Sequence, residues 1–217
     1  MLTNYDAKAV AEVMGIAFLD DPEGGPAAAG KTAKAARGSK AVAGAKIGKF
    51  VIAVDHASVR IVEIRTKGAF GRFEKSKRDT HRNAIARNAK LRPASPVLIE
   101  KAVENGLPRL VLRHVAEQIA GTDKAKISSL EWGIVPRTTL ERRAEQLSPP
   151  ESERTERVAR LFVHARRVLG SDAEAREFLT TPHPLLDGRT PIDAARTDLG
   201  TRRTEQILNA LEYGLAL

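Results

Sequence analysis

Glycine and proline divide the second half of the chain into short segments whose apolar residues recur at helical spacing. Ser95-Pro96 is typical of a helix start, since serine caps the first turn and proline lacks an amide hydrogen that this turn cannot use. The helix so begun is predicted to run to Gly106. Another, starting at Pro108 and stopping at Gly121, carries its apolar residues on one face. We therefore expect residues 95–217 to be entirely helical.

Two short helices follow, joined by a tight connection. We predict the first over about 123–132 and the second from Arg137 to Gln146, with Gly133-Ile134-Val135-Pro136 between them. A pair of short helices linked by a glycine-containing turn is typical of a helix-turn-helix. In such a pair Leu140 should face inward and pack. Residues 95–150 are predicted to form this domain.

Residues 151–217 are predicted to form a second small helical domain. A long helix with one apolar stripe should cover 151–169, and Ser171 to Glu174 forms a capping box for a short helix. The connection over 181–189 is rich in turn residues, and Gly188 is expected at positive φ. Thr190-Pro191 should begin another helix, and a last helix should follow Gly200.

The basic excess of the chain lies at its N-terminus. Residues 1–90 hold 17 lysines and arginines against 9 acidic residues, and the whole chain carries a net charge of +9. Residues 22–49 and 67–95 have too few large apolar side chains to fold alone. Residues 50–66 are rich in β-branched side chains, and this pattern predicts a possible hairpin. We expect residues 1–94 to be a basic, low-complexity, largely disordered extension on a mainly all-α protein. It is either an arm that binds polyanions or a solvated tail.

Several classes of function receive no support. The chain has no cysteine and five widely separated histidines, so we expect no metal site and no cofactor, and no catalytic constellation is visible. Segments typical of membrane spans or signal peptides are absent, and we expect a soluble, cytoplasmic protein that binds no membrane. Gly25 to Thr32 matches the P-loop pattern, but its surroundings are biased in composition and no firm helix follows it, so we reject a nucleotide hydrolase.

The C-terminal motifs resemble those of one known family. Phe178-Leu-Thr-Thr-Pro-His-Pro-Leu-Leu-Asp-Gly-Arg-Thr-Pro-Ile-Asp193 resembles the hallmark of the Xre/MbcA/ParS toxin-binding domain, and Ile207 to Gly214 fits the end of that domain. Upstream, Gly133 to Arg143 resembles the Xre-like helix-turn-helix, and Leu147 to Ser152 resembles the junction between the two domains. The resemblance covers about residues 95–217.

This resemblance implies an antitoxin of a type II toxin–antitoxin system. Its partner would be a toxin of the RES type, which consumes NAD or transfers ADP-ribose, and the antitoxin would cover the active site of that toxin with its C-terminal end. The toxin-binding candidates are Arg189, Glu212, Tyr213, Gly214, Leu215, Ala216 and Leu217. Arg189 could instead have a purely structural role, and the tail could simply be a frayed terminus.

A helix-turn-helix places its second helix in the major groove of DNA, with the N-terminal residues of that helix at the base edges. The DNA-binding candidates are therefore Arg137, Thr138, Thr139, Arg142 and Arg143, with Lys124 and Lys126 as phosphate contacts. A degenerate helix-turn-helix with a solvated, charged face is the alternative. Repression of its own operator by a homodimer is what the resemblance implies. The competing function is a stand-alone transcription regulator whose C-terminal domain only dimerises.

Overall fold

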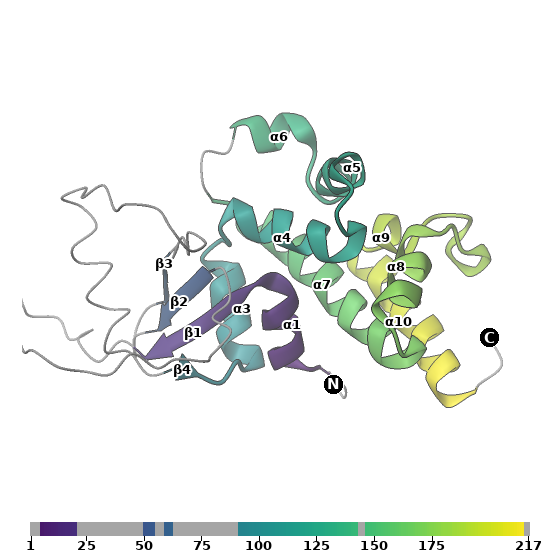
Figure 1. The fold of residues 1–217 in the computed structure, drawn as a ribbon, viewed down its shortest axis with the longest axis horizontal. Coiled ribbons are helices and arrows are strands. Elements are labelled where there is room, and N and C mark those ends of the chain that lie inside the picture. Colours follow the sequence, from purple (N-terminus) through teal and green to yellow (C-terminus); the bar gives the residue numbers. More distant parts are fainter. Residues whose placement is uncertain (1–4, 21–49, 55–58, 63–90, 143–145, 215–217) are drawn as a thin grey trace, which may run out of the picture.

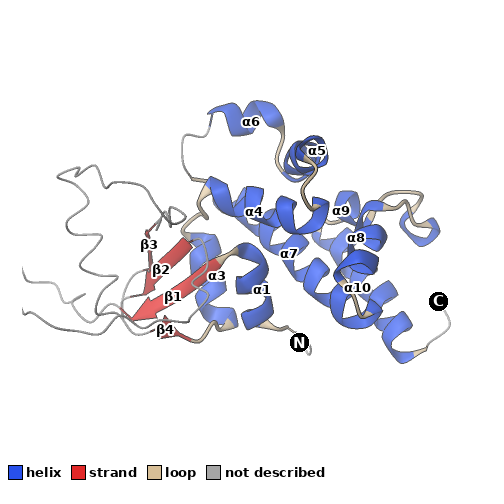
Figure 2. Cartoon of the chain, in the orientation of Figure 1, coloured by secondary structure: helices blue, strands red, loops and turns tan. Residues whose placement is uncertain are grey.

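The computed structural model describes residues 5–20, 50–54, 59–62, 91–142 and 146–214. In chain order the elements are α1 (Ala7–Met14), β1 (Ile16–Asp20), β2 (Phe50–Val54), β3 (Val59–Val62), β4 (Leu91–Arg92), α3 (Pro96–Glu104), α4 (Arg109–Ala120), α5 (Lys124–Ile134), α6 (Arg137–Arg142), α7 (Pro149–Leu169), α8 (Asp172–Thr180), the 3₁₀ helix η1 (Pro184–Leu186), α9 (Pro191–Ala194) and α10 (Asp198–Tyr213). Helices dominate the fold, as Figure 2 shows, and the predicted mainly helical class is confirmed.

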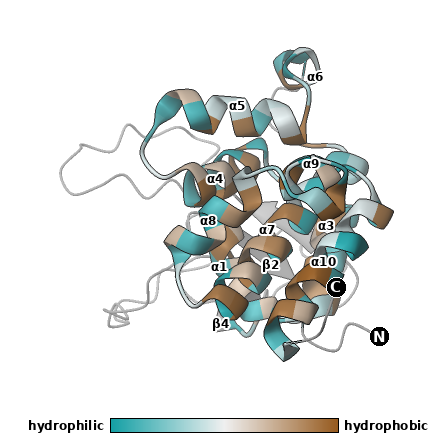
Figure 3. Cartoon of the chain, turned by 90° about the vertical axis from the view of Figure 1, so that its right-hand side faces the viewer, coloured by the Kyte–Doolittle hydropathy of each residue, from teal (hydrophilic) through white to brown (hydrophobic). Residues whose placement is uncertain are grey.

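The long helix α7 lies at the centre of the helical part and contacts most of the other helices. Helices α1, α3 and α4 pack on α7, and α8 and α10 pack on it as well (Figure 1). It begins at a capping box in which the Ser148 amide donates to Oε2 of Glu151 at 2.7 Å. Its apolar stripe includes Leu161 and Phe162, which are buried, and apolar colour gathers between the helices in Figure 3. The core is therefore organised around a single helix.

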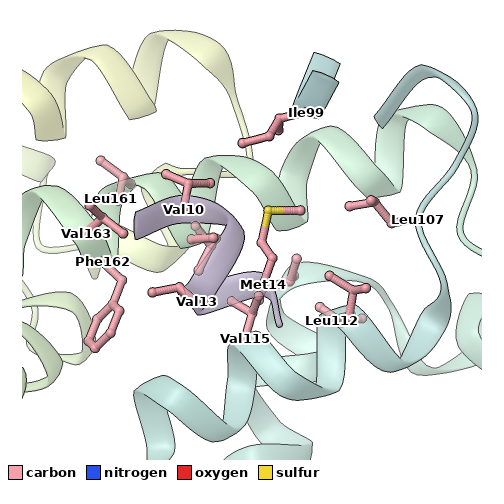
Figure 4. Close-up of a cluster of buried hydrophobic side chains, with 14 of the residues drawn as sticks. Val10, Val13, Met14, Ile99, Leu107, Leu112, Val115, Leu161, Phe162 and Val163 are labelled. Carbon is pink, nitrogen blue, oxygen red and sulfur yellow. The ribbon is translucent and has the colours of Figure 1, made fainter. Parts of the chain in front are cut away.

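Helix α1 belongs to this core, which differs from our expectation of a largely disordered extension over residues 1–94. Val10, Val13 and Met14 are buried in one cluster with residues of α3, α4 and α7, as Figure 4 shows. Asp6 caps the helix by accepting from the Ala9 amide at 3.0 Å, and Gly15 ends it in the left-handed region. What the sequence reasoning missed is that this segment packs into the core, because its partners lie more than 80 residues further along the chain.

The predicted hairpin forms within a larger sheet with the strand order β3-β2-β1-β4. Strands β2 and β3 pair antiparallel, as expected from residues 50–66, and β1 adds to β2 in parallel from Ile16↔Phe50 to Asp20↔Val54. Strand β4 closes the other edge, antiparallel to β1. The parallel pair was not predicted. The expected disorder of residues 22–49 and of most of 67–95 lies outside the described residues.

A cluster of polar side chains joins Tyr5, just before α1, to α7 and α10. The hydroxyl of Tyr5 donates to Oε1 of Glu156 at 2.9 Å, and Arg160 lies 4.0 Å from Glu156 and 3.2 Å from Glu205. Burial raises the pKa of Glu156, while the neighbouring Arg160 and the hydrogen bond from Tyr5 act in the opposite direction. The start of the chain is thus tied to α7 by a hydrogen bond as well as by apolar packing.

Two glycines have different places from those predicted. Gly133 lies inside α5, and Gly200 lies in the first turn of α10, which begins at Asp198 after the cap residue Thr197. A Cβ atom at Gly200 would lie 2.7 Å from the carbonyl carbon of Ala194, so α10 crosses α9 at this glycine. Gly200 therefore allows two helices to approach closely and does not precede a helix.

No helix in the described residues is long and apolar enough to cross a membrane.

Candidate functional site

Helices α5 and α6 form the predicted helix-turn-helix pair. Asp123 caps α5 by accepting from the amides of Ala125 and Lys126, and Val135 and Pro136 connect the two helices. Leu140, on α6, is 3% exposed and faces the core, as expected of the packing residue. Figure 1 shows α5 and α6 on the outside of the bundle, beyond α4. This arrangement leaves the outer face of α6 open to a large partner.

The outer face of α6 carries the predicted DNA contacts. Arg137, Thr138 and Arg142 are exposed and Thr139 is half-buried. Lys124 and Lys126 are exposed in the first turn of α5. Arg143, also predicted as a contact, lies outside the described residues. The described candidates thus place four positive charges on the two helices of one structural motif.

Arg137 has two partners within the same motif. Its Nε lies 2.7 Å from Oε1 of Glu141, one turn further along α6, and its guanidinium carbon lies 5.1 Å from the ring centroid of Trp132 on α5. A cation over an aromatic face is attracted electrostatically, so the ring and the carboxylate together fix where this arginine lies. The contact of Arg137 with a guanine edge stays a prediction, and it would require the Glu141 carboxylate to release the guanidinium group.

The turn between α8 and α9 is a compact, internally bonded loop. Gly188 has φ of 72°, as predicted, and Asp187 before it also has positive φ. The amide of His183 donates to the Arg189 carbonyl at 3.0 Å, which closes the loop. Thr190 caps α9, with Pro191 in its first turn, also as predicted. The loop has one backbone path fixed by its own hydrogen bonds.

Arg189 contributes to the structure of this loop. Its Nε donates to the Leu186 carbonyl at 3.2 Å, and Nη2 lies 3.3 Å from Oδ2 of Asp187. Of the two roles left open for it, the described contacts are those of the structural one. The side chain nevertheless keeps 46% of its surface exposed, so contact with a partner remains a prediction.

Arg203, on α10, contacts this loop and was missed by the sequence reasoning. From α10, its Nη1 lies 2.9 Å from Oδ2 of Asp187 and its Nη2 donates to the Leu185 carbonyl at 2.7 Å. The hydrogen bond and charge of Arg203 lower the pKa of the Asp187 carboxyl. No local pattern marks Arg203, because its partners lie 16 and 18 residues earlier in the chain.

The end of α10 is the other part of the predicted toxin-binding region. Glu212 lies 3.1 Å from Nη2 of Arg167 and 3.8 Å from Nε2 of His164, both on α7. Tyr213 is 62% exposed, and Gly214 ends the helix with φ of 62°. Leu215, Ala216 and Leu217 lie outside the described residues. The helix is thus anchored to α7 up to its last turn, where an aromatic side chain faces solvent.

The two sets of candidates lie on different parts of the molecule. Helix α6 and the C-terminal end of α10 are far apart in both Figure 1 and Figure 3, so one partner on each surface is sterically possible.

Within the described part of the chain, no group of three histidine or acidic side chains could hold a metal ion. The P-loop-like residues from Gly25 to Thr32 lie outside it.

Comparison with known proteins assigns both regions. Residues 99–160 match the family of antitoxin Xre-like helix-turn-helix domains, and residues 164–214 match the family of antitoxin Xre/MbcA/ParS C-terminal toxin-binding domains. The two matches are separated by residues 161–163, which lie inside α7, and the division at residue 150 stays a prediction. The Antitoxin Xre of Pseudomonas putida strain KT2440 is 32% identical over 87 residues, or 39% of this chain and 55% of that protein. The chain therefore matches only about half the length of this relative.

Proposed function

We propose that this chain, which belongs to the Xre/MbcA/ParS antitoxin family, neutralises a RES-type toxin by covering the active site of that toxin and represses its own operon by binding operator DNA. The observation that carries the proposal is the order of the two matched domains, in which the exposed helix pair precedes the anchored C-terminal helices. The toxin would consume NAD or transfer ADP-ribose. The complex would form in the cytoplasm, with the antitoxin as a homodimer on its operator.

The end of α10 supports the first half of the proposal. Because Arg167 on α7 pairs with Glu212, the last turn of the helix is held against α7, and Tyr213 stands exposed at its end. A large, amphipathic aromatic side chain loses little conformational entropy on binding and is enriched in protein interfaces. Tyr213 and the four residues after it would therefore enter the cleft of the toxin.

The neighbouring gene provides the test of this half. Its product should deplete cellular NAD or stop growth when expressed alone, and co-expression of the full chain should restore both. Deletion of 213–217 should abolish this rescue without lowering the melting temperature, because Tyr213 makes little contact with the core. Full rescue by the truncated chain would show that the toxin is covered by another surface.

The outer face of α6 supports the second half. Arginine can donate two parallel hydrogen bonds to the N7 and O6 atoms of guanine, which is the commonest specific contact in the major groove. Arg137 and Arg142 are exposed on α6, and Lys124 and Lys126 lie on α5, where phosphate contacts would be expected. DNA binding by this helix pair would be independent of the C-terminal tail.

A double substitution tests this half separately. Arg137→Ala with Arg142→Ala should weaken binding to a duplex taken from upstream of the chain's own gene, and toxin neutralisation should persist. Lys8→Ala with Lys101→Ala is the matched control, since it removes two exposed charges from α1 and α3. Equal losses in both variants would indicate only nonspecific electrostatic binding. If the neighbouring product is harmless but DNA binding remains, the chain is a stand-alone regulator.

A further inference from the structure

A series of polar contacts connects the turn motif of the toxin-binding region to the helix-turn-helix. The hydroxyl of Thr190 donates to Oδ2 of Asp193 at 2.8 Å, and the Asp193 amide donates back to Oγ1 of Thr190 at 3.1 Å. The other carboxylate oxygen of Asp193 lies 3.4 Å from Nη2 of Arg196. Nε of Arg196 in turn donates to the carbonyl of Gly133 on α5 at 3.0 Å. The cap of α9 thus orients an arginine that reaches another helix.

The acceptor at Gly133 is one of the last carbonyls of α5. The last four carbonyls of a helix lack partners within the helix, and the helix dipole makes this end negative. A guanidinium group donates a hydrogen bond to such a carbonyl, and its positive charge also interacts favourably with the negative end of the helix dipole. Because only Ile134 lies between Gly133 and the connection to α6, this bond holds the end of α5 close to the point where α6 begins.

A second arginine of the C-terminal region makes the same kind of contact with α4. Nε of Arg176, on α8, donates to the carbonyl of Gln118 at 2.8 Å, in the last turn of α4. Helices α5 and α9 also contact each other directly. Helices α4 and α5, the two directly before α6, therefore each accept a hydrogen bond from an arginine at their C-terminal ends. Both arginines belong to the region that matches the toxin-binding domain.

We propose that Arg196 is a positioning residue for DNA binding, although it lies outside the helix-turn-helix. This inference rests on the proposed function, in which α6 contacts DNA. The residue before Gly133 is Trp132, whose ring lies against the guanidinium group of Arg137. A shift of the α5 end would therefore move both the start of α6 and the arginine that reads the groove. The toxin-binding region sets this position through Asp193 and Arg196.

The test compares three variants of the full chain. Arg196→Ala should weaken binding to the upstream duplex about fivefold, in line with the loss of one charge-assisted cap. Arg196→Lys keeps a donor and the charge, and should recover part of that loss. Arg202→Ala is the matched control, because Arg202 is 71% exposed and pairs with Asp198 on its own helix. Binding of the neighbouring gene product should be the same in all three.

A second measurement does not require DNA. Trp132 is the only tryptophan of the chain, so quenching of its fluorescence by acrylamide reports the end of α5 specifically. Quenching should increase in Arg196→Ala and not in Arg202→Ala. Unchanged quenching together with unchanged DNA affinity would overturn the inference, as would an equal loss of DNA and toxin binding. If the unmodified chain does not bind the duplex at all, the proposed function fails and the role of Arg196 in DNA binding fails with it, whereas the quenching result still shows whether Arg196 holds the end of α5.

Discussion

Replacing Met14 by alanine tests whether the start of the chain is part of the core. Met14 is fully buried in α1, within a cluster that also contains Val10, Val115 and Phe162. Alanine is the better helix former, so the substitution removes packing without weakening the helix itself. Truncation of a buried methionine to alanine costs about 2–5 kcal/mol, because the cavity left behind closes only in part.

That loss is a large fraction of the ~5–15 kcal/mol that stabilises a typical domain. For a chain of this size it corresponds to a fall in melting temperature on the order of 10 °C. Urea unfolding should be followed by circular dichroism and by the fluorescence of Trp132, which lies on α5 and away from α1. If the helical part unfolds as one unit, both signals should shift together to lower urea.

The matched control is Glu12→Ala, on the exposed side of the same helix. It should change the unfolding midpoint by less than about 0.5 kcal/mol, as is usual for surface positions. The reasoning is refuted if Met14→Ala and Glu12→Ala unfold alike, since α1 would then contribute nothing to the core. Truncation before residue 95 would also leave a stable protein in that case.

Further predictions concern the C-terminal helices. Gly200→Ala should destabilise the protein by about 1–3 kcal/mol, because the added methyl group meets the backbone of Ala194. Gly133→Ala, in α5, adds a methyl group that meets no atom, so it should be neutral or stabilise the protein by up to ~1 kcal/mol. The melting temperatures of the two variants should therefore differ. Burial lowers the pKa of His164 below its ordinary value of about 6.5, so its protonation opposes folding and stability is lost as the pH falls through that value. The urea midpoint should therefore fall between pH 7.5 and 5.5, and His164→Gln should reduce this fall; an identical pH dependence in the variant would contradict the assignment.

Capping signals in the sequence predicted several of the helix boundaries. Ser95, Ser171 and Thr190 each cap the helix that they were expected to begin, and Gly121 ends the helix that it was expected to end. These features depend on hydrogen bonds within a few residues, so the chemistry of a short segment is enough to reveal them. The positive φ of Gly188 was predicted for the same reason.

Contacts between distant segments were the features that escaped prediction. The parallel pairing of β1 with β2 joins segments separated by residues 21–49, and no short pattern distinguishes such a pair from an isolated hairpin. Arg196 and Arg203 appear in the sequence as ordinary surface arginines, but each binds a carbonyl that lies 63 or 18 residues away. The role of Gly200 was missed for the same reason, because the need for a glycine at this position arises only from the close approach of α9 and α10.

The antiparallel pairing of β1 with β4 has a consequence for how this protein could change over time. Phe18 pairs with Arg92 and Leu19 with Leu91, so the chain leaves the helical bundle and returns to it through neighbouring strands of one ladder. The free energy of closing a loop grows only slowly with its length, by roughly 0.6 kcal/mol for each doubling. Insertions between β1 and β4 that leave β2 and β3 in place would thus be tolerated while α1 and α3 keep their positions. The segment between β1 and β4 is therefore a suitable point for adding new sequence to this chain.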